Sequence, residues 1–340
     1  MGIDEKDVDR RRELFRQDRE RHPETRELWK EWEQRRTVRE HEVLAYPTLT
    51  LRRHADLRPD DTSPPVEPLT VGFGALGDAV ALWPGSNEGG EGVVSRHGSD
   101  GRWNDRTPLS SRSPRGHVQP LPDGEVLFVD ARCRRDEHNA AVYDESGRVL
   151  RTAHLGDGIE HVLTTAAGAV WTAYFDEGVF AMRGLSTHGL VRFGSDLSPQ
   201  WRYPQARQTD LPVISDCYAL NVAGEAAWTC AYVDFHLVNV DDARAVDHGP
   251  APVSGASGLL VEGARAALIG ASAGGRGVVT PVHLTDDGLR PAGPPRRLVL
   301  PDGAPVPTLQ FARFTCRGPE LHVAIGATWY RFDLDDVPTG

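Results

Sequence analysis

Ile159-Glu-His-Val-Leu-Thr-Thr-Ala-Ala-Gly-Ala-Val-Trp171 and Asp216-Cys-Tyr-Ala-Leu-Asn-Val-Ala-Gly-Glu-Ala-Ala-Trp228 are two copies of one pattern. In each copy an apolar segment leads to a turn with glycine and then to a second apolar segment that ends in tryptophan. Glycine supplies the positive φ that a tight hairpin turn requires, so each copy predicts two antiparallel strands. Residues 117–127 follow the same plan and place His117 at the position of His161. The fold is therefore expected to consist of repeated hairpins.

The hairpin recurs along the rest of the chain, once in about 48 residues. Its turn glycines are Gly77, Gly124, Gly168, Gly224, Gly263 and Gly318. A third strand is expected after each hairpin, at Val93–Ser95, Ala141–Tyr143, Leu190–Phe193, Leu237–Val240, Val279–Leu284 and Thr328–Phe332. Polar turns rich in Asp and Gly lead on to fourth strands. Such units predict an all-β fold, a six-bladed β-propeller with blades near residues 70–112, 116–155, 159–205, 214–250, 255–300 and 308–338.

The sixth unit ends after its third strand, so another segment is expected to cover that strand. A long exposed edge strand invites aggregation, and a strand from the opposite end of the chain removes the edge by closing the ring. Residues 43–53 alternate in hydrophobicity and are predicted to supply this closing strand. An outermost strand tolerates Pro47 because one of its edges is free. Residues 54–68 are then expected to be a linker, since they are polar and rich in proline.

Residues 1–42 differ from the rest of the chain in being dense in charged residues, and they predict a helical arm before the propeller domain at residues 43–340. A helix is expected to begin near Pro23, where the missing N–H costs nothing. Its apolar residues form one narrow stripe, Leu28, Trp29 and Trp32. This stripe packs on the side of the propeller or, as the alternative, docks a partner or a second subunit.

Composition agrees with short strands and many turns. The chain has 35 glycines and 25 prolines, which would break long helices. The four cysteines contain no Cys-x-x-Cys pair, and they are expected to be reduced, separately buried thiols: Cys133, Cys217, Cys230 and Cys316. A bridge between Cys217 and Cys230 on neighbouring strands is the alternative.

The charge and the N-terminal sequence narrow the class of partner. A net charge of −11 argues against nucleic-acid binding, which needs a basic face to neutralise phosphates. No stretch reaches the roughly 18 apolar residues of a membrane span, and the first residues lack the features of a secretory signal. Only Lys6 and Lys30 among the 38 basic residues are lysines, a bias typical of GC-rich bacterial genomes. We therefore expect a bacterial cytoplasmic protein with no membrane or nucleic-acid partner.

The repeat resembles the bacterial propeller families with NHL and two-component-regulator propeller repeats. Their blades likewise read as an apolar strand, a turn with Gly and an Ile/Val-Trp pair, as in Gly168-Ala-Val-Trp171. Further phrases of this kind are Gly158–Val162, Tyr174–Phe180, Gly189–Phe193 and Asp216–Val222. The resemblance covers residues 70–338, is specific over residues 155–240, and implies a fold without an activity. Sugar-lactone hydrolases also look like six-bladed rings, but their metal-binding set of Glu, Asn and Asp cannot be placed in full in this sequence.

Polar residues gather where a propeller usually carries its function. The first strand of each blade lines the axis, and the loops that enter it meet at one mouth. Blades two to four contribute the expected binding residues His117, Glu160, His161, Asp176, Glu177, Asp216, Tyr218 and Asp234. Crowded carboxylates can hold a hard cation such as Ca²⁺ or Mg²⁺, with Glu160, Asp176, Glu177 and Asp216 as candidate ligands. Candidate acid–base residues are His161, Glu160 and Asp216.

A structural role for the same residues stays open, because carboxylates at strand entries often cap turns or pair with arginine. The leading hypothesis is a cytoplasmic binding or scaffold propeller that presents an acidic channel mouth to a protein or a small molecule. The alternative is a metal-assisted hydrolase or lyase with its site at the same mouth.

Overall fold

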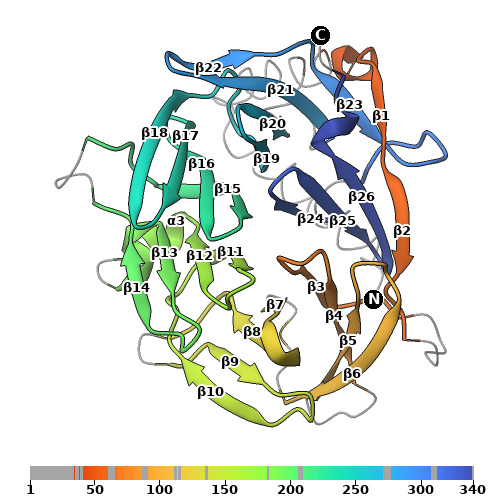
Figure 1. Cartoon of the computed structure of the whole chain (residues 1–340), viewed down its shortest axis with the longest axis vertical. Helices are drawn as coiled ribbons and strands as arrows, with labels where there is room; N and C mark the ends of the chain where they lie inside the picture. The colour runs from red at the N-terminus through yellow and green to blue at the C-terminus, as the bar shows by residue number, and fades with distance from the viewer. Residues whose placement is uncertain are drawn as a thin grey trace, which may run out of the picture.

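A ring of β-sheets surrounds a central axis in the computed structural model of this chain (Figure 1). The structure describes residues 34, 38, 41–59, 66–85, 91–110, 113, 116–134, 137–181, 184–205, 210–270, 277–307 and 312–338. These residues are almost entirely strands and the turns between them, and successive sheets follow one another around the ring in chain order. The fold is therefore all-β and propeller-like.

Three sheets have four antiparallel strands each. The first contains β3 (Thr70–Phe73), β4 (Ala79–Pro84), β5 (Gly92–His97) and β6 (Trp103–Leu109). The second contains β7 (Gly116–Pro120), β8 (Val126–Asp130), β9 (Ala140–Tyr143) and β10 (Val149–Ala153). The third contains β11 (Ile159–Thr164), β12 (Val170–Tyr174), β13 (Leu190–Phe193) and β14 (Pro199–Arg202).

The two remaining sheets are larger. A six-stranded sheet contains β19 (Gly258–Glu262), β20 (Arg265–Ile269), β21 (Val278–Thr285), β22 (Gly288–Pro291), β23 (Arg296–Val299) and β1 (Thr48–Thr50). An eight-stranded sheet joins two antiparallel runs of four strands. The first run is β15 (Asp216–Ala223), β16 (Ala226–Tyr232), β17 (His236–Asp241) and β18 (Arg244–Pro250). The second run is β24 (Ala312–Arg317), β25 (Glu320–Ile325), β26 (Thr328–Asp333) and β2 (Arg52–Asp56).

The two runs of the eight-stranded sheet meet at one parallel pairing, between Asn221 and Cys316. Asn221 is fully buried there, and its amide nitrogen donates to the carbonyl oxygens of Leu259 and Gly318 at 2.6 and 2.8 Å. Its Oδ1 accepts from the Gly318 N–H at 2.7 Å. One side chain thus joins first strands from three successive parts of the ring.

The hairpin turns lie where the sequence predicts them. Each of the six turn glycines falls between the first and second strand of its run, as at Gly168 between β11 and β12. All six have positive φ, from 54° at Gly318 to 83° at Gly168. A residue with a side chain is strained in this conformation, which is why glycine occurs at these turns.

The strand that pairs with β26 shares only Arg52 and Arg53 with the predicted closing segment 43–53 and continues to Asp56. β2 pairs antiparallel with β26, from Arg52 opposite Arg331 to Asp56 opposite Thr328. Residues 54–56 are thus part of a strand and not of a linker. The earlier residues Thr48–Thr50 form β1, which runs parallel to β23 in the six-stranded sheet.

Burial explains why the alternating segment divides between two sheets. Leu49 and Leu51 are both buried in one apolar cluster with residues of β20 and β25. The Leu51 N–H donates to the carbonyl oxygen of Val299, so the chain stays bound to the six-stranded sheet up to this residue. The alternation of apolar residues therefore reflects packing between two sheets, and the edge pairing with β26 begins only after Leu51.

The helical arm expected at residues 1–42 lies almost wholly outside the described residues, of which 41–44 are helical. Within the described part of the chain, no helix is both long and apolar enough to cross a membrane. All four cysteines are free thiols, three of them buried.

A buried arginine ties several first strands together at the axis. Arg317, the last residue of β24, is 7% exposed. Its Nε and Nη2 donate to the carbonyl oxygen of Phe73, and its Nη1 donates to that of Thr164 at 2.6 Å. Nη2 also donates to Gln119 Oε1 at 2.9 Å. These acceptors come from β3, β11 and β7, so a single cation joins four first strands.

Candidate functional site

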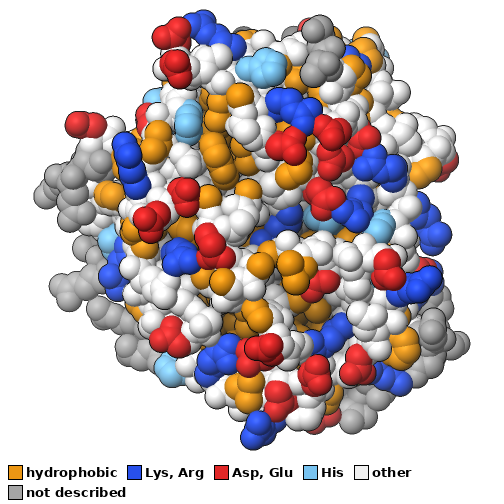
Figure 2. Space-filling model, viewed as in Figure 1, with side chains coloured by type: hydrophobic (Ala, Val, Ile, Leu, Met, Phe, Trp, Pro, Cys, Tyr) orange, Lys and Arg blue, Asp and Glu red, His pale blue; other side chains and the backbone are white. Residues whose placement is uncertain are grey.

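A cavity of about 490 Å³ lies between the first strands of the ring. Residues of β3, β7, β11, β15 and β24 line this central cavity, together with Gly255 and Ser257 just before β19. Charged side chains of both signs surround the centre of the face seen in Figure 2. The volume falls within the range of about 300–1,000 Å³ that is usual for small-molecule sites.

Five residues expected at the mouth line this cavity. They are His117 of β7, Glu160 and His161 of β11, and Asp216 and Tyr218 of β15. Each stands in the first half of its strand, because the first strands all run away from the same end of the ring. Three separate parts of the sequence thus contribute polar groups to one space.

The other three expected residues lie outside the cavity lining. Asp176 and Glu177 begin the short helix α3 (Asp176–Val179), which follows β12. Glu177 forms an ion pair with Arg132, which also donates to Asp157 at 3.0 Å. Asp234 is exposed in the loop between β16 and β17. Of these three, Asp176 is the one whose charge raises the pKa of Asp216.

The two cavity histidines make the same contact with the next strand. His117 Nε2 lies 3.4 Å from the carbonyl oxygen of Ile159, and His161 Nε2 lies 3.3 Å from that of Tyr218. A carbonyl oxygen only accepts, so the Nε2 of each histidine is the donor. Burial, together with the nearby His161 and Arg313, lowers the pKa of His117 to about 4. His117 is therefore neutral at pH 7.

Two carboxyl groups of the lining, from β11 and β15, lie close enough for their charges to interact. Burial, together with the charges of Glu160 and Asp176, raises the pKa of Asp216 to about 6. A cation entering this part of the cavity would favour the ionised carboxyl and displace its proton. Burial and the Asp216 charge also raise the pKa of Tyr218. We call Glu160, Asp216 and Tyr218 the carboxylate side of the cavity.

Aromatic rings extend the carboxylate side outward. Tyr218 stacks on Tyr232 with ring centroids 5.9 Å apart and an interplanar angle of 15°. Phe235 packs against both rings at 5.7 Å, and Phe175 lines the cavity from the end of β12. The carboxylates therefore lie beside π faces, an arrangement that suits organic cations.

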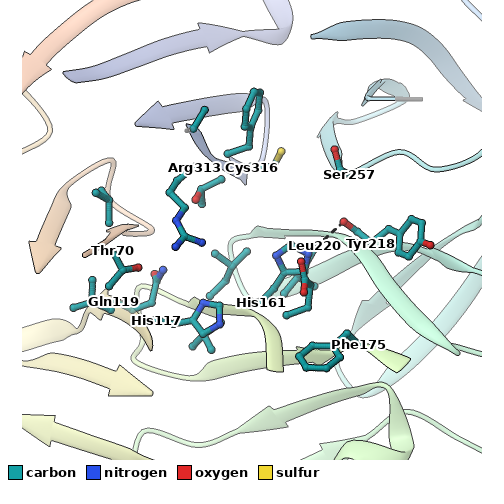
Figure 3. A pocket seen from close by; sticks show the side chains of 18 of the residues that line it. Thr70, His117, Gln119, His161, Phe175, Tyr218, Leu220, Ser257, Arg313 and Cys316 are labelled. Atoms are coloured by element: carbon teal, nitrogen blue, oxygen red, sulfur yellow. Dashed lines mark hydrogen bonds between the residues drawn. The ribbon is translucent and has the colours of Figure 1, made fainter. Parts of the chain in front are cut away.

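Arg313 is a charged residue of the cavity lining that the sequence did not indicate. It is the second residue of β24 and is exposed within the cavity lining. Figure 3 shows its side chain directed into the cavity, toward the part where His117 and Gln119 lie. His117 and Glu160 are also second residues of first strands. This common strand position is the sequence signal that could have found Arg313.

Gln119 is oriented by the buried arginine. Because a guanidinium only donates, Gln119 Oε1 must be the acceptor of its bond to Arg317. The amide nitrogen is then the group that Gln119 has left to offer as a donor. We call Arg313, Gln119 and His117 the arginine side of the cavity. The mouth is thus not uniformly acidic, as the sequence suggested, but carries charges of both signs.

The candidate cation ligands do not form a compact set. Among the residues that the structure describes, no group of three or more His, Cys, Asp and Glu side chains is arranged to hold a metal ion. Glu160 and Asp216 line the cavity, whereas Glu177 is paired with Arg132. Binding of Ca²⁺ or Mg²⁺ stays a prediction.

No protein-family model matches the sequence, and no curated protein matches it either. Among solved structures, apo AztD from Citrobacter koseri is 13% identical, with 73% of this chain and 64% of that chain covered and a TM-score of 0.41. A protein named as a candidate gluconolactonase is 14% identical, with 83% of this chain and 97% of that chain covered and a TM-score of 0.37.

A third similar structure is the extracellular domain of the hybrid two-component system BT4673 from B. thetaiotaomicron. It is 10% identical, with 85% of this chain but 37% of that chain covered and a TM-score of 0.44.

Proposed function

We propose that this chain is a six-bladed β-propeller that binds a small polar molecule in its central cavity. The antiparallel pairings support the blade count, because they divide β2–β22 and β24–β26 into six runs of four strands. β2 then serves as the outer strand of the last blade, paired with β26.

The observation that carries the binding function is the unused polar capacity of the cavity lining. Arg313 and Glu160 both line the cavity and both are exposed in it. Among the described residues, neither side chain makes a hydrogen bond or an ion pair. A group with a structural role would be paired within the protein, whereas a ligand supplies partners to groups that the fold leaves open.

A filled-cavity variant tests this function. Thr315 lines the cavity and is half-buried, so Thr315→Trp would occupy ligand space. Thr50 is exposed on β1, and Thr50→Trp is the matched control. A panel of polar metabolites is screened by thermal shift and by calorimetry. We expect at least one compound to bind the wild type and the control equally, and Thr315→Trp at least about tenfold more weakly. No binder, or binding unchanged by Thr315→Trp, would contradict the proposal.

A metal-assisted hydrolase or lyase at the same site is the second candidate. The charges of Glu160 and Asp176 both raise the pKa of Asp216, so three carboxyl groups lie near one another. This grouping favours the metal-assisted enzyme, since hard cations prefer carboxylate oxygens. Metal analysis of the purified protein, with melting curves measured with and without a chelator, tests this candidate. A stoichiometric ion that is lost in Asp176→Ala would support it, and a metal-free protein indifferent to chelator would oppose it. The cytoplasmic location stays a prediction.

A further inference from the structure

The central cavity presents opposite charges on two of its sides. The arginine side carries a guanidinium with no partner among the described residues, and the carboxylate side carries two carboxyl groups. Figure 3 shows Arg313 on the far side of the cavity from Tyr218, with His161 between them. Among the described residues, Arg313 forms no ion pair with Glu160 or Asp216.

The arginine side is built to receive an anion. A guanidinium presents a planar fork of donors that matches the two oxygens of a carboxylate. Arg317 holds Gln119 by its carbonyl oxygen, which leaves the amide nitrogen as a second donor near Arg313. Arg317 itself is buried behind Gln119, and its charge makes this part of the lining more favourable for a negative group.

The carboxylate side is built to receive a cation. Glu160 and Asp216 stand on the neighbouring strands β11 and β15, and Asp176 adds a third negative charge nearby. The stacked rings of Tyr218 and Tyr232 border the same part of the lining. An ammonium group bound there would gain both charge pairing and contact with aromatic faces.

We propose that the ligand is a small zwitterion of the amino-acid or short-peptide class, with its carboxylate at Arg313 and its ammonium group at Glu160 and Asp216. This inference rests on the proposed function of the cavity and names its ligand class. A ligand with only one charge would leave the opposite side of the cavity unpaired after water is displaced, and such unpaired charge is costly.

A series of ω-amino acids of increasing length tests the inference. Glycine, 4-aminobutyrate, 6-aminohexanoate and 8-aminooctanoate are titrated into the wild-type protein by calorimetry, each beside the carboxylate and the amine of equal length. We expect one length to bind best, and to bind at least about tenfold more tightly than both single-charge analogues. The best length measures the separation of the two sides.

Two charge-removing variants assign the ends of the ligand. Arg313→Gln should abolish the advantage of the zwitterion over the plain amine, and Glu160→Gln should abolish its advantage over the plain carboxylate. Both residues are exposed in the cavity, so both variants should fold, and melting curves verify this. Arg102, with a side chain 86% exposed and outside the cavity lining, provides the control variant Arg102→Gln, which should bind as the wild type does.

The outcomes separate this inference from the proposed function. If a plain carboxylate or amine binds as tightly as the best zwitterion, the ligand class is wrong and binding in the cavity stands. The ligand class is also wrong, and binding in the cavity also stands, if no ω-amino acid binds but the metabolite panel yields a compound that Thr315→Trp binds more weakly. If the series and the panel both fail, both proposals are overturned.

Discussion

Replacing the buried Arg317 by methionine should destabilise the protein by about 3 kcal/mol. Three acceptors lose their donor in Arg317→Met: the carbonyl oxygens of Phe73 and Thr164, and Gln119 Oε1. Each buried acceptor left unpaired costs about 1–3 kcal/mol. We use the lower value because burial of the cation is itself unfavourable, as its effect on the pKa of Arg317, lowered to about 9, indicates.

Two further substitutions make this prediction specific. Arg317→Lys keeps a cation with three donors but loses the planar fork, so it should lose about half as much stability. Arg313→Met changes the same residue type on the same strand, but at an exposed position without a partner among the described residues. The free energy of unfolding of Arg313→Met should stay within about 0.5 kcal/mol of the wild-type value.

Urea unfolding followed by tryptophan fluorescence and circular dichroism measures all three variants against the wild type. The order of midpoints should be wild type and Arg313→Met, then Arg317→Lys, then Arg317→Met. Equal midpoints for Arg313→Met and Arg317→Met would refute the reasoning, since only the second removes buried donors. If Arg317→Met does not fold, a wild-type midpoint for Arg317→Lys would refute it instead.

Four other substitutions test a buried charge, a buried amide and two glycines. The folded-state pKa of Asp216, about 6, lies above its ordinary 3.8, so the contribution of this group to stability falls as pH rises from about 4 to 6. Asp216→Asn should remove that fall and raise the free energy of unfolding at pH 8 by about 1 kcal/mol after allowance for solvent screening. Melting curves measured across pH would reveal both effects. Asn221→Ala should cost about 2–3 kcal/mol in urea unfolding, because it leaves two carbonyls at 2.6 and 2.8 Å without their donor. Gly263→Ala should cost about 1–2 kcal/mol by backbone strain alone at φ +58°, with open space around the new methyl. Gly72→Ala should cost much more in the same assay, because its Cβ would lie 1.6 Å from the carbonyl oxygen of Val118.

Much of the strand pattern was predictable because it depends on local stereochemistry. A turn of few residues needs positive φ, and glycine adopts it without strain, so the hairpin at Gly168 can be located from the residues around it. Cavity residues such as His161 were predictable for a related reason, because they enter first strands next to recognisable turns.

The remaining features depend on contacts between distant parts of the chain. The apolar alternation before Arg52 indicates a strand but not its neighbour, and the structure pairs Thr48–Thr50 with β23 and Arg52–Asp56 with β26. The position of Arg313 in the cavity lining could not be predicted for the same reason. An arginine on a strand is usually a solvated surface residue, and only the closed arrangement of the first strands directs this one into a cavity.

The pairing of β2 with β26 also sets an order of events during translation. The Arg52–Asp336 contact spans 284 residues. At about 5–20 residues per second, the ribosome needs roughly 15–60 s to supply the later partner. During that time β2 is a nascent strand with a vacant edge. Its sequence, Arg52-Arg-His-Ala-Asp56, is largely charged and polar, and charges are what keep unpaired edges from joining the wrong chain. The charges of β2 thus protect its edge until β26 has been synthesised.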